Sequence, residues 1–154
     1  MKSPCCILAL VIGVALAALL YRFIIAGDTL PASDQRTAII LSEGERDMVL
    51  GEMRSFLETI QVITAALVND DLVAVEKAAR AVGMASSEGV PASLVTKLPL
   101  AFKTLGLGTH EKFDQLALNA AQFGDKHTTL TELSELMQNC VACHATYRID
   151  TAIR

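Results

Sequence analysis

The chain has 154 residues, of which 52% are hydrophobic, and it carries 13 Lys and Arg against 17 Asp and Glu. This length suits one domain rather than two. Two of the basic residues and none of the acidic ones lie before Gly27, so the remainder has 11 basic and 17 acidic side chains and a net charge near −6. An acidic chain without a basic patch is not expected to bind nucleic acid.

The N-terminal segment is apolar throughout. An unbroken run of apolar or small residues extends from Pro4 to Leu20, and four more apolar residues follow after a Tyr-Arg pair. A helix that is apolar on all sides is typical of a membrane span or a secretory signal. No convincing small-x-small cleavage site follows, so we predict an uncleaved signal-anchor over residues 1–26, with a cleaved signal peptide as the alternative. Lys2 would stay cytoplasmic, placing the rest on the periplasmic side of a bacterial inner membrane, anchored or, after cleavage, soluble.

Residues 27–41 are polar and contain a proline, which predicts a linker. Residues 42–154 form the predicted domain. No strand pattern persists in the chain, so we predict an all-α fold. Its form is an antiparallel four-helix bundle, preceded by one N-terminal hydrophobic helix.

Four amphipathic segments are the expected helices of this bundle, because each repeats its apolar residues at steps of three and four. They are residues 43–69, 70–83, 109–124 and 125–150. The first begins at Ser42 and Glu45, which have the spacing of a capping box. Residues 84–108 contain two prolines and end glycine-rich, which predicts a long connection with one or two short helical turns.

The last helix carries the motif CxxCH, formed by Cys140, Cys143 and His144. Zinc, dithiol redox chemistry and covalent haem all use a CxxC pair. Zinc usually needs a second pair of ligands, and a redox-active CxxC belongs at a helix N-terminus after a strand. The helical periodicity places Cys140 and His144 on the inward face. In an exported chain the motif therefore predicts one haem c, bound through both thiols, with His144 as the proximal iron ligand.

This last helix resembles that of the class II c-type cytochromes, the cytochrome c prime family. The resemblance covers roughly residues 42–150 and rests on Cys140, Cys143, His144, Tyr147, Arg148 and Arg46. It implies a periplasmic four-helix electron carrier, and it leaves a homodimer open. It also implies that Arg148, one helical turn past His144, lies near the haem edge or a propionate; a solvated Arg at the helix end is the alternative.

The residues around the motif also bear on enzyme activity and on binding partners. No activated nucleophile or acid–base pair lies near the CxxCH, so no enzyme activity is expected. An acidic surface with two haem propionates would steer the carrier toward a redox partner protein with a basic patch. The membrane is the other expected partner, contacted through the N-terminal segment.

The sixth iron position separates two functions within the family. Met53 lies on the apolar seam of the first helix, and the helical rise puts it at the height of His144. We therefore predict Met53 as the sixth ligand of an electron carrier, although a Met on a seam is also ordinary core filler. Alignment through Arg46 instead puts Leu50 over the iron, which would give a five-coordinate, high-spin protein that binds NO or CO. His110 is a third candidate ligand.

Overall fold

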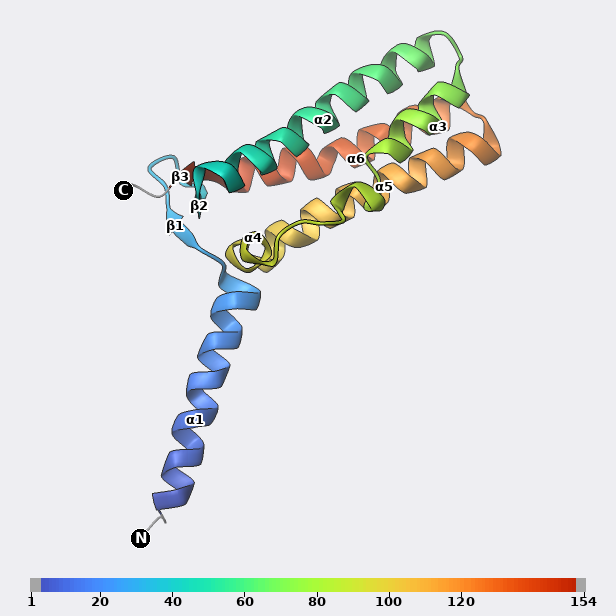
Figure 1. Ribbon diagram of the computed structural model, residues 1–154. Helices are drawn as coiled ribbons and strands as arrows, with labels where there is room; N and C mark the ends of the chain where they lie inside the picture. Colours follow the sequence, from blue (N-terminus) through green and yellow to red (C-terminus); the bar gives the residue numbers. More distant parts are fainter. Residues whose placement is uncertain (1–3, 152–154) are drawn as a thin grey trace.

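The computed structural model describes residues 4–151, which form a mostly helical chain with one small sheet (Figure 1). Lys2 and the last three residues of the predicted domain lie outside the described residues. The elements are α1 (Pro4–Leu20), η1 (Tyr21–Ala26), β1 (Thr29–Pro31), β2 (Thr37–Leu41), α2 (Glu43–Val68), α3 (Leu72–Ala81), η2 (Met84–Ser87), α4 (Ala92–Lys97), α5 (Leu100–Phe123), α6 (Lys126–Thr146) and β3 (Tyr147–Thr151).

The predicted N-terminal apolar helix is confirmed. Helix α1 and the π-helical turn η1 form one continuous apolar helix that projects away from the domain (Figure 1). Within residues 4–151, the 22-residue segment Cys5–Ala26 is long and apolar enough to cross a membrane by length and composition. At about 1.5 Å per residue it is roughly 33 Å long, close to the thickness of a bilayer core. A membrane anchor and a signal sequence both fit this helix.

The main core lies between four helices that pack pairwise. Helix α3 packs on α2 and α5, α5 packs on α6, and α2 also contacts α6. Phe56 of α2 stacks on Phe113 of α5 with ring centroids 5.4 Å apart. Phe113 is fully buried in this core, as are Ile63, Leu67, Val75, Leu116 and Leu136.

Helices α2 and α3 begin and end close to where the sequence predicts. At the start of α2 the capping box is complete, since Ser42 and Glu45 each bond the other's backbone N–H. Helix α3 is capped by the Asp71 side chain, which accepts from the Ala74 N–H at 2.9 Å. Such caps satisfy backbone donors that a helix leaves without partners at its first turn.

Helices α5 and α6 differ from their predicted bounds. Helix α5 begins at Leu100 rather than near Thr109, because burial of Phe102 offsets the cost of two glycines inside the helix. Pro99 precedes it and suits a helix start. Helix α6 ends at Thr146 instead of continuing to residue 150, and the chain turns into a strand at Tyr147.

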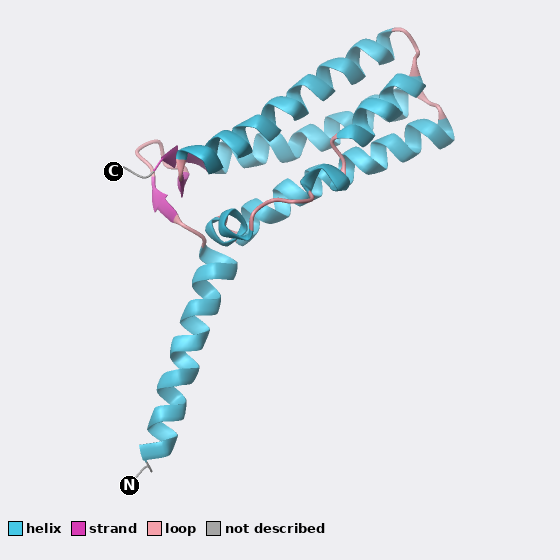
Figure 2. Ribbon diagram, in the orientation of Figure 1, coloured by secondary structure: helices cyan, strands magenta, loops and turns pink. Residues whose placement is uncertain are grey.

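The chain is not all-α as predicted, because the predicted linker, 27–41, contains β1 and β2. Strand β2 is central: it pairs antiparallel with β1 and parallel with β3. Thr37 lies opposite Tyr147 and Leu41 opposite Thr151. The three strands gather at one end of the helical domain (Figure 2). The sequence does not reveal β2 because its partner β3 lies more than a hundred residues away, and sheets are stabilised by such cross-strand neighbours.

A second core joins this sheet to the helices. Its buried members are Ile39, Leu41, Val49, Leu94, Leu98 and Phe102. Beside it, Lys97 of α4 donates to both carboxylate oxygens of Glu45 at 2.8 and 2.7 Å. The hydrogen bonds from Lys97 and then from the Ser42 backbone lower the pKa of Glu45 from 4.5 to about 2. Glu45 therefore closes the capping box of α2 and ties α2 to α4.

Replacing Glu45 by Gln should lower the free energy of unfolding at neutral pH by roughly 1.5–3 kcal/mol, the usual range for hydrogen bonds to charged groups. A carboxylate with a depressed pKa stabilises the fold above its unfolded pKa and loses that effect as pH falls. The difference between wild type and Glu45→Gln should therefore shrink between pH 4.5 and about 2. Urea denaturation of the full chain measures it. Glu58→Gln, on an exposed site of the same helix, is the control and should follow wild type.

Candidate functional site

The CxxCH segment occupies the last two turns of α6. Leu133 and Leu136 are buried, and the half-buried Cys140 and Cys143 continue the same face of the helix toward its end. Both cysteines are free thiols. His144, predicted to lie on the inward face, is exposed. The prediction of an inward His144 is wrong because the buried face is rotated by about one residue from the predicted seam, and Cys143 rather than His144 faces the core.

Cys143 contacts the second core together with Met53 of α2. Tyr147 and Ile149 of β3 pack against the same cluster, and the Tyr147 ring meets Phe102 edge-on with centroids 5.5 Å apart. The structure thus brings the predicted ligand Met53 and the CxxCH segment to one apolar cluster. Leu50 is half-buried and is not part of that cluster.

Burial makes both thiols weak acids. It raises the pKa of Cys143 to about 11, with a further contribution from the nearby Cys140, and it also raises the pKa of Cys140. Reactive redox cysteines show the opposite behaviour, since a depressed pKa supplies the nucleophilic thiolate. The environment of this pair therefore favours protonated thiols over dithiol exchange chemistry.

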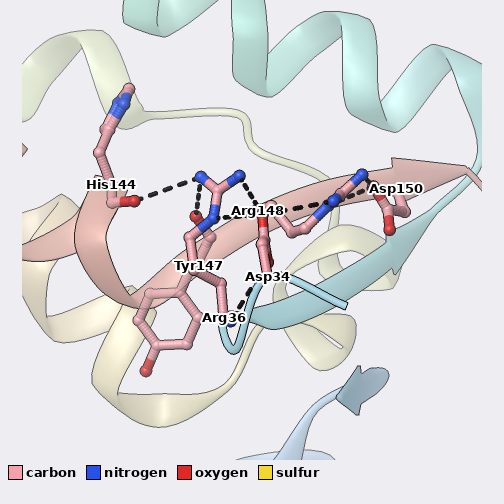
Figure 3. A network of polar contacts seen from close by, with 6 residues as sticks. All are labelled: Asp34, Arg36, His144, Tyr147, Arg148 and Asp150. Atoms are coloured by element: carbon pink, nitrogen blue, oxygen red, sulfur yellow. Dashed lines mark hydrogen bonds and ion pairs between the residues drawn. The ribbon is translucent and has the colours of Figure 1, made fainter. Parts of the chain in front are cut away.

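Arg36, from the predicted linker, holds the chain immediately after the motif (Figure 3). Its Nη1 donates to the carbonyl oxygens of His144 and Tyr147, each at 3.3 Å. The Asp34 carboxylate accepts from Arg36 Nε at 2.9 Å and Nη2 at 2.7 Å and so orients the guanidinium. These hydrogen bonds also lower the pKa of Asp34. Carbonyls at a helix C-terminus lack helical partners and favour a cation, so Arg36 caps α6.

Sequence reasoning missed Arg36, because the contact joins residues 108 positions apart. The only local signal is the acidic and basic pair Asp34 and Arg36 in a segment that otherwise reads as a linker.

Arg148 does not stack on the helix side of His144, because α6 has already ended. In β3 its neighbours Tyr147 and Ile149 face the second core, and strand alternation turns Arg148 to the other side. There Arg148 donates to the Asp150 carboxylate from Nε and Nη2, each at 2.9 Å. Its Nη1 lies 3.4 Å from Asp34 Oδ2 (Figure 3).

Two surface pockets lie along α2. One, of about 550 Å³, lies between the start of α2 and β3 and brings Arg46 beside Arg148. The other, of about 410 Å³, lies between α2 and the η2 region. Neither is lined by Cys140, Cys143 or His144. Across residues 4–151 no group of three or more His, Cys, Asp or Glu side chains could hold a metal ion.

His110, the third candidate ligand, is buried in the middle of α5 and is 3% exposed. Its Nδ1 lies 2.8 Å from the Val82 carbonyl oxygen and 3.2 Å from Ser86 Oγ, and its Nε2 lies 3.2 Å from Glu52 Oε1. Phe56 meets the ring edge-on at 4.9 Å. Both ring nitrogens are engaged, so in this arrangement His110 offers none to an iron ion.

The His110–Glu52 pair should make stability depend on pH. Burial lowers the pKa of His110, but the hydrogen bonds to Glu52 and Val82 raise it more, so it lies above 6.5. A group whose pKa is raised by folding stabilises the fold fully at pH values below its unfolded pKa. That stabilisation is lost as the pH rises through its folded pKa. Relative to Glu52→Gln, wild type should therefore lose free energy of unfolding as pH rises above 6.5. Urea denaturation across pH measures the slope, and Glu111→Gln, at an exposed neighbour, should follow wild type.

The site thus consists of the Cys143 thiol and the Met53 thioether against one apolar cluster, the half-buried Cys140 thiol one helical turn before Cys143, and Arg36 holding the backbone that follows. Of the predicted residues, Cys143 and Met53 come together at the second core, with Cys140 one turn earlier on the same face of α6, whereas His110 lies elsewhere with partners of its own. No protein-family model, curated protein or solved structure matches the chain.

Proposed function

We propose that the protein is an exported c-type cytochrome that carries electrons through one haem bound covalently to α6. The observation that carries the proposal is the pair of free thiols, Cys140 and Cys143, on the inward face of the last helix, α6, with His144 next to them. Two thiols and an adjacent imidazole are what covalent haem attachment requires.

The surrounding residues fit this group. The second core offers an apolar wall beside Cys143, and Met53 adds a thioether from the facing helix. His144 lies about 40° around the helix axis from Cys140, so its ring can turn toward the same side as the thiols. Because neither pocket along α2 includes the motif, the cluster has to open to admit a porphyrin.

Attachment needs no oxidant. Each thiol adds across one vinyl group, so that sulfur bonds to one vinyl carbon and the thiol hydrogen goes to the other. When bound, the haem supplies a one-electron iron couple. His144 would bind the iron, the second core would exclude water, and Arg36 would hold the His144 backbone in place through its carbonyl.

A four-helix arrangement and a periplasmic location complete the proposal. The pairwise packing of α2, α3, α5 and α6 supports the first, and the apolar helix Cys5–Ala26 supports the second. The acidic surface suits a redox partner with a basic patch, with association rates that fall as salt rises. The proposed role is electron transfer and not catalysis.

Replacing Cys140 and Cys143 together by Ala should abolish the haem that stays on the chain after denaturation. Denaturing gel electrophoresis followed by haem staining measures this, in cells that mature c-type cytochromes. Cys5→Ala/Cys6→Ala is the matched control and should keep the stain, since those cysteines lie in the apolar helix. A wild-type chain that carries no stain, or that co-purifies with zinc instead, contradicts the proposal.

Replacing Met53 by Ala should convert a low-spin haem to high-spin and create binding of carbon monoxide, because the sixth ligand is lost. Optical spectra of the oxidised and reduced protein, with and without the gas, measure both changes. Leu50→Ala is the control and should remain low-spin. A wild type that is already high-spin, with Met53→Ala unchanged, would refute the carrier and support gas binding under Leu50.

A further inference from the structure

The apolar N-terminal helix joins the domain rigidly. Gly27 follows the helix with φ of +65° and is buried, and a Cβ there would overlap the backbone of Lys97 to Pro99. The Asp28 N–H donates to the Lys97 carbonyl at 2.7 Å, and the Asp28 carbonyl accepts from the Ile40 N–H at 2.8 Å. These contacts bind the first residues after the helix to both α4 and β2.

Side-chain contacts reinforce this junction from the helix itself. Arg22 of η1 donates to the Gly27 carbonyl and pairs with the Asp28 carboxylate. Lys103 of α5 reaches back into the apolar helix and donates to the Ile24 carbonyl at 3.0 Å. A helix held by so many contacts cannot swing freely as a tether does, so the direction of the helix determines the orientation of the domain.

The Lys103 contact also fixes the level of the start of α5 relative to the end of the apolar helix. Ile24 lies in the last turn of the segment that could span a membrane, Cys5–Ala26. Tyr21 and Arg22 are residue types that favour the membrane–water interface at the end of a span. If this segment spans the bilayer, the Lys103 ammonium lies at the level of the last turn of the span, among the lipid headgroups.

Exposed leucines share the helix face of Lys103. Leu100 lies three residues before it and Leu107 four residues after it, so all three follow one side of α5. Leu100 is 42% exposed and Leu107 is 49% exposed. Figure 1 shows that the start of α5 and α4 form the corner of the domain from which α1 departs, and that α5 then runs away from α1.

We infer that the Leu100 end of this face rests on the surface of the bilayer that holds α1, so that the domain docks on lipid in one orientation. This surface contact rests on the proposed membrane anchor. The continuity of the face with the span, through the Lys103–Ile24 contact, is the reason to name lipid rather than a protein as its partner. The sheet and the CxxCH end of α6 lie at this same end of the domain (Figure 1).

The absence of tryptophan from the chain permits a direct test. Single-tryptophan variants of the full chain are reconstituted into phosphatidylcholine vesicles whose acyl chains are brominated both near the headgroup and near the middle of the bilayer. Emission is compared, for each variant, with that in the same vesicles without bromine, so that quenching by any bound haem cancels. Leu100→Trp reports the proposed contact, and Leu16→Trp reports insertion of α1.

Leu118→Trp is the matched control. It lies five helical turns beyond Leu100 on the same face of α5 and is 41% exposed, almost as much as Leu100. Bromine should quench Leu16→Trp and Leu100→Trp and leave Leu118→Trp unchanged. If bromine quenches Leu16→Trp but not Leu100→Trp, the docking surface is wrong and the anchor is supported. If Leu16→Trp is not quenched, the anchor fails and the docking surface fails with it.

Discussion

The parallel pairing of β2 with β3 is the constraint on which the rest of the domain depends. Strand β2 leads directly into α2, and β3 leads directly out of α6. Their pairing therefore fastens the first helix of the domain to the last one at a defined register, with Ile39 opposite Ile149. Both of these side chains belong to the second core, so the sheet and the apolar cluster stabilise one another.

The candidate site follows from that pairing. Once α6 ends beside β2, Arg36 reaches the carbonyls of His144 and Tyr147, and Cys143 meets the cluster that Met53 enters from α2. The thiols are half-buried because the helix end is held against the sheet. A half-buried thiol resists ionisation, which disfavours nucleophilic dithiol chemistry at this pair.

The same end of the domain also carries the apolar N-terminal helix, so three features meet there: that helix, the sheet and the CxxCH segment (Figure 1). Glu45 and Lys97 link these features. Glu45 caps α2 and accepts hydrogen bonds from the Lys97 ammonium, and the Lys97 carbonyl accepts from the Asp28 N–H that follows the apolar helix.

The sequence by itself determined the features that depend on near neighbours. The apolar helix, the capping box of Ser42 and Glu45, the Asp71 cap and the run of helices are set by residues within a few positions of one another, as is the CxxCH spacing. The placement of Met53 near the end of α6 was also predicted, because helical rise along two antiparallel helices puts it there, while its role as an iron ligand stays a prediction. Only the tertiary structure decided the strands, the Arg36 cap, the early start of α5, and the turn of His144 away from the core. Each of these depends on a partner far along the chain, such as β3 for β2, and local patterns contain no information about which distant segment will supply it.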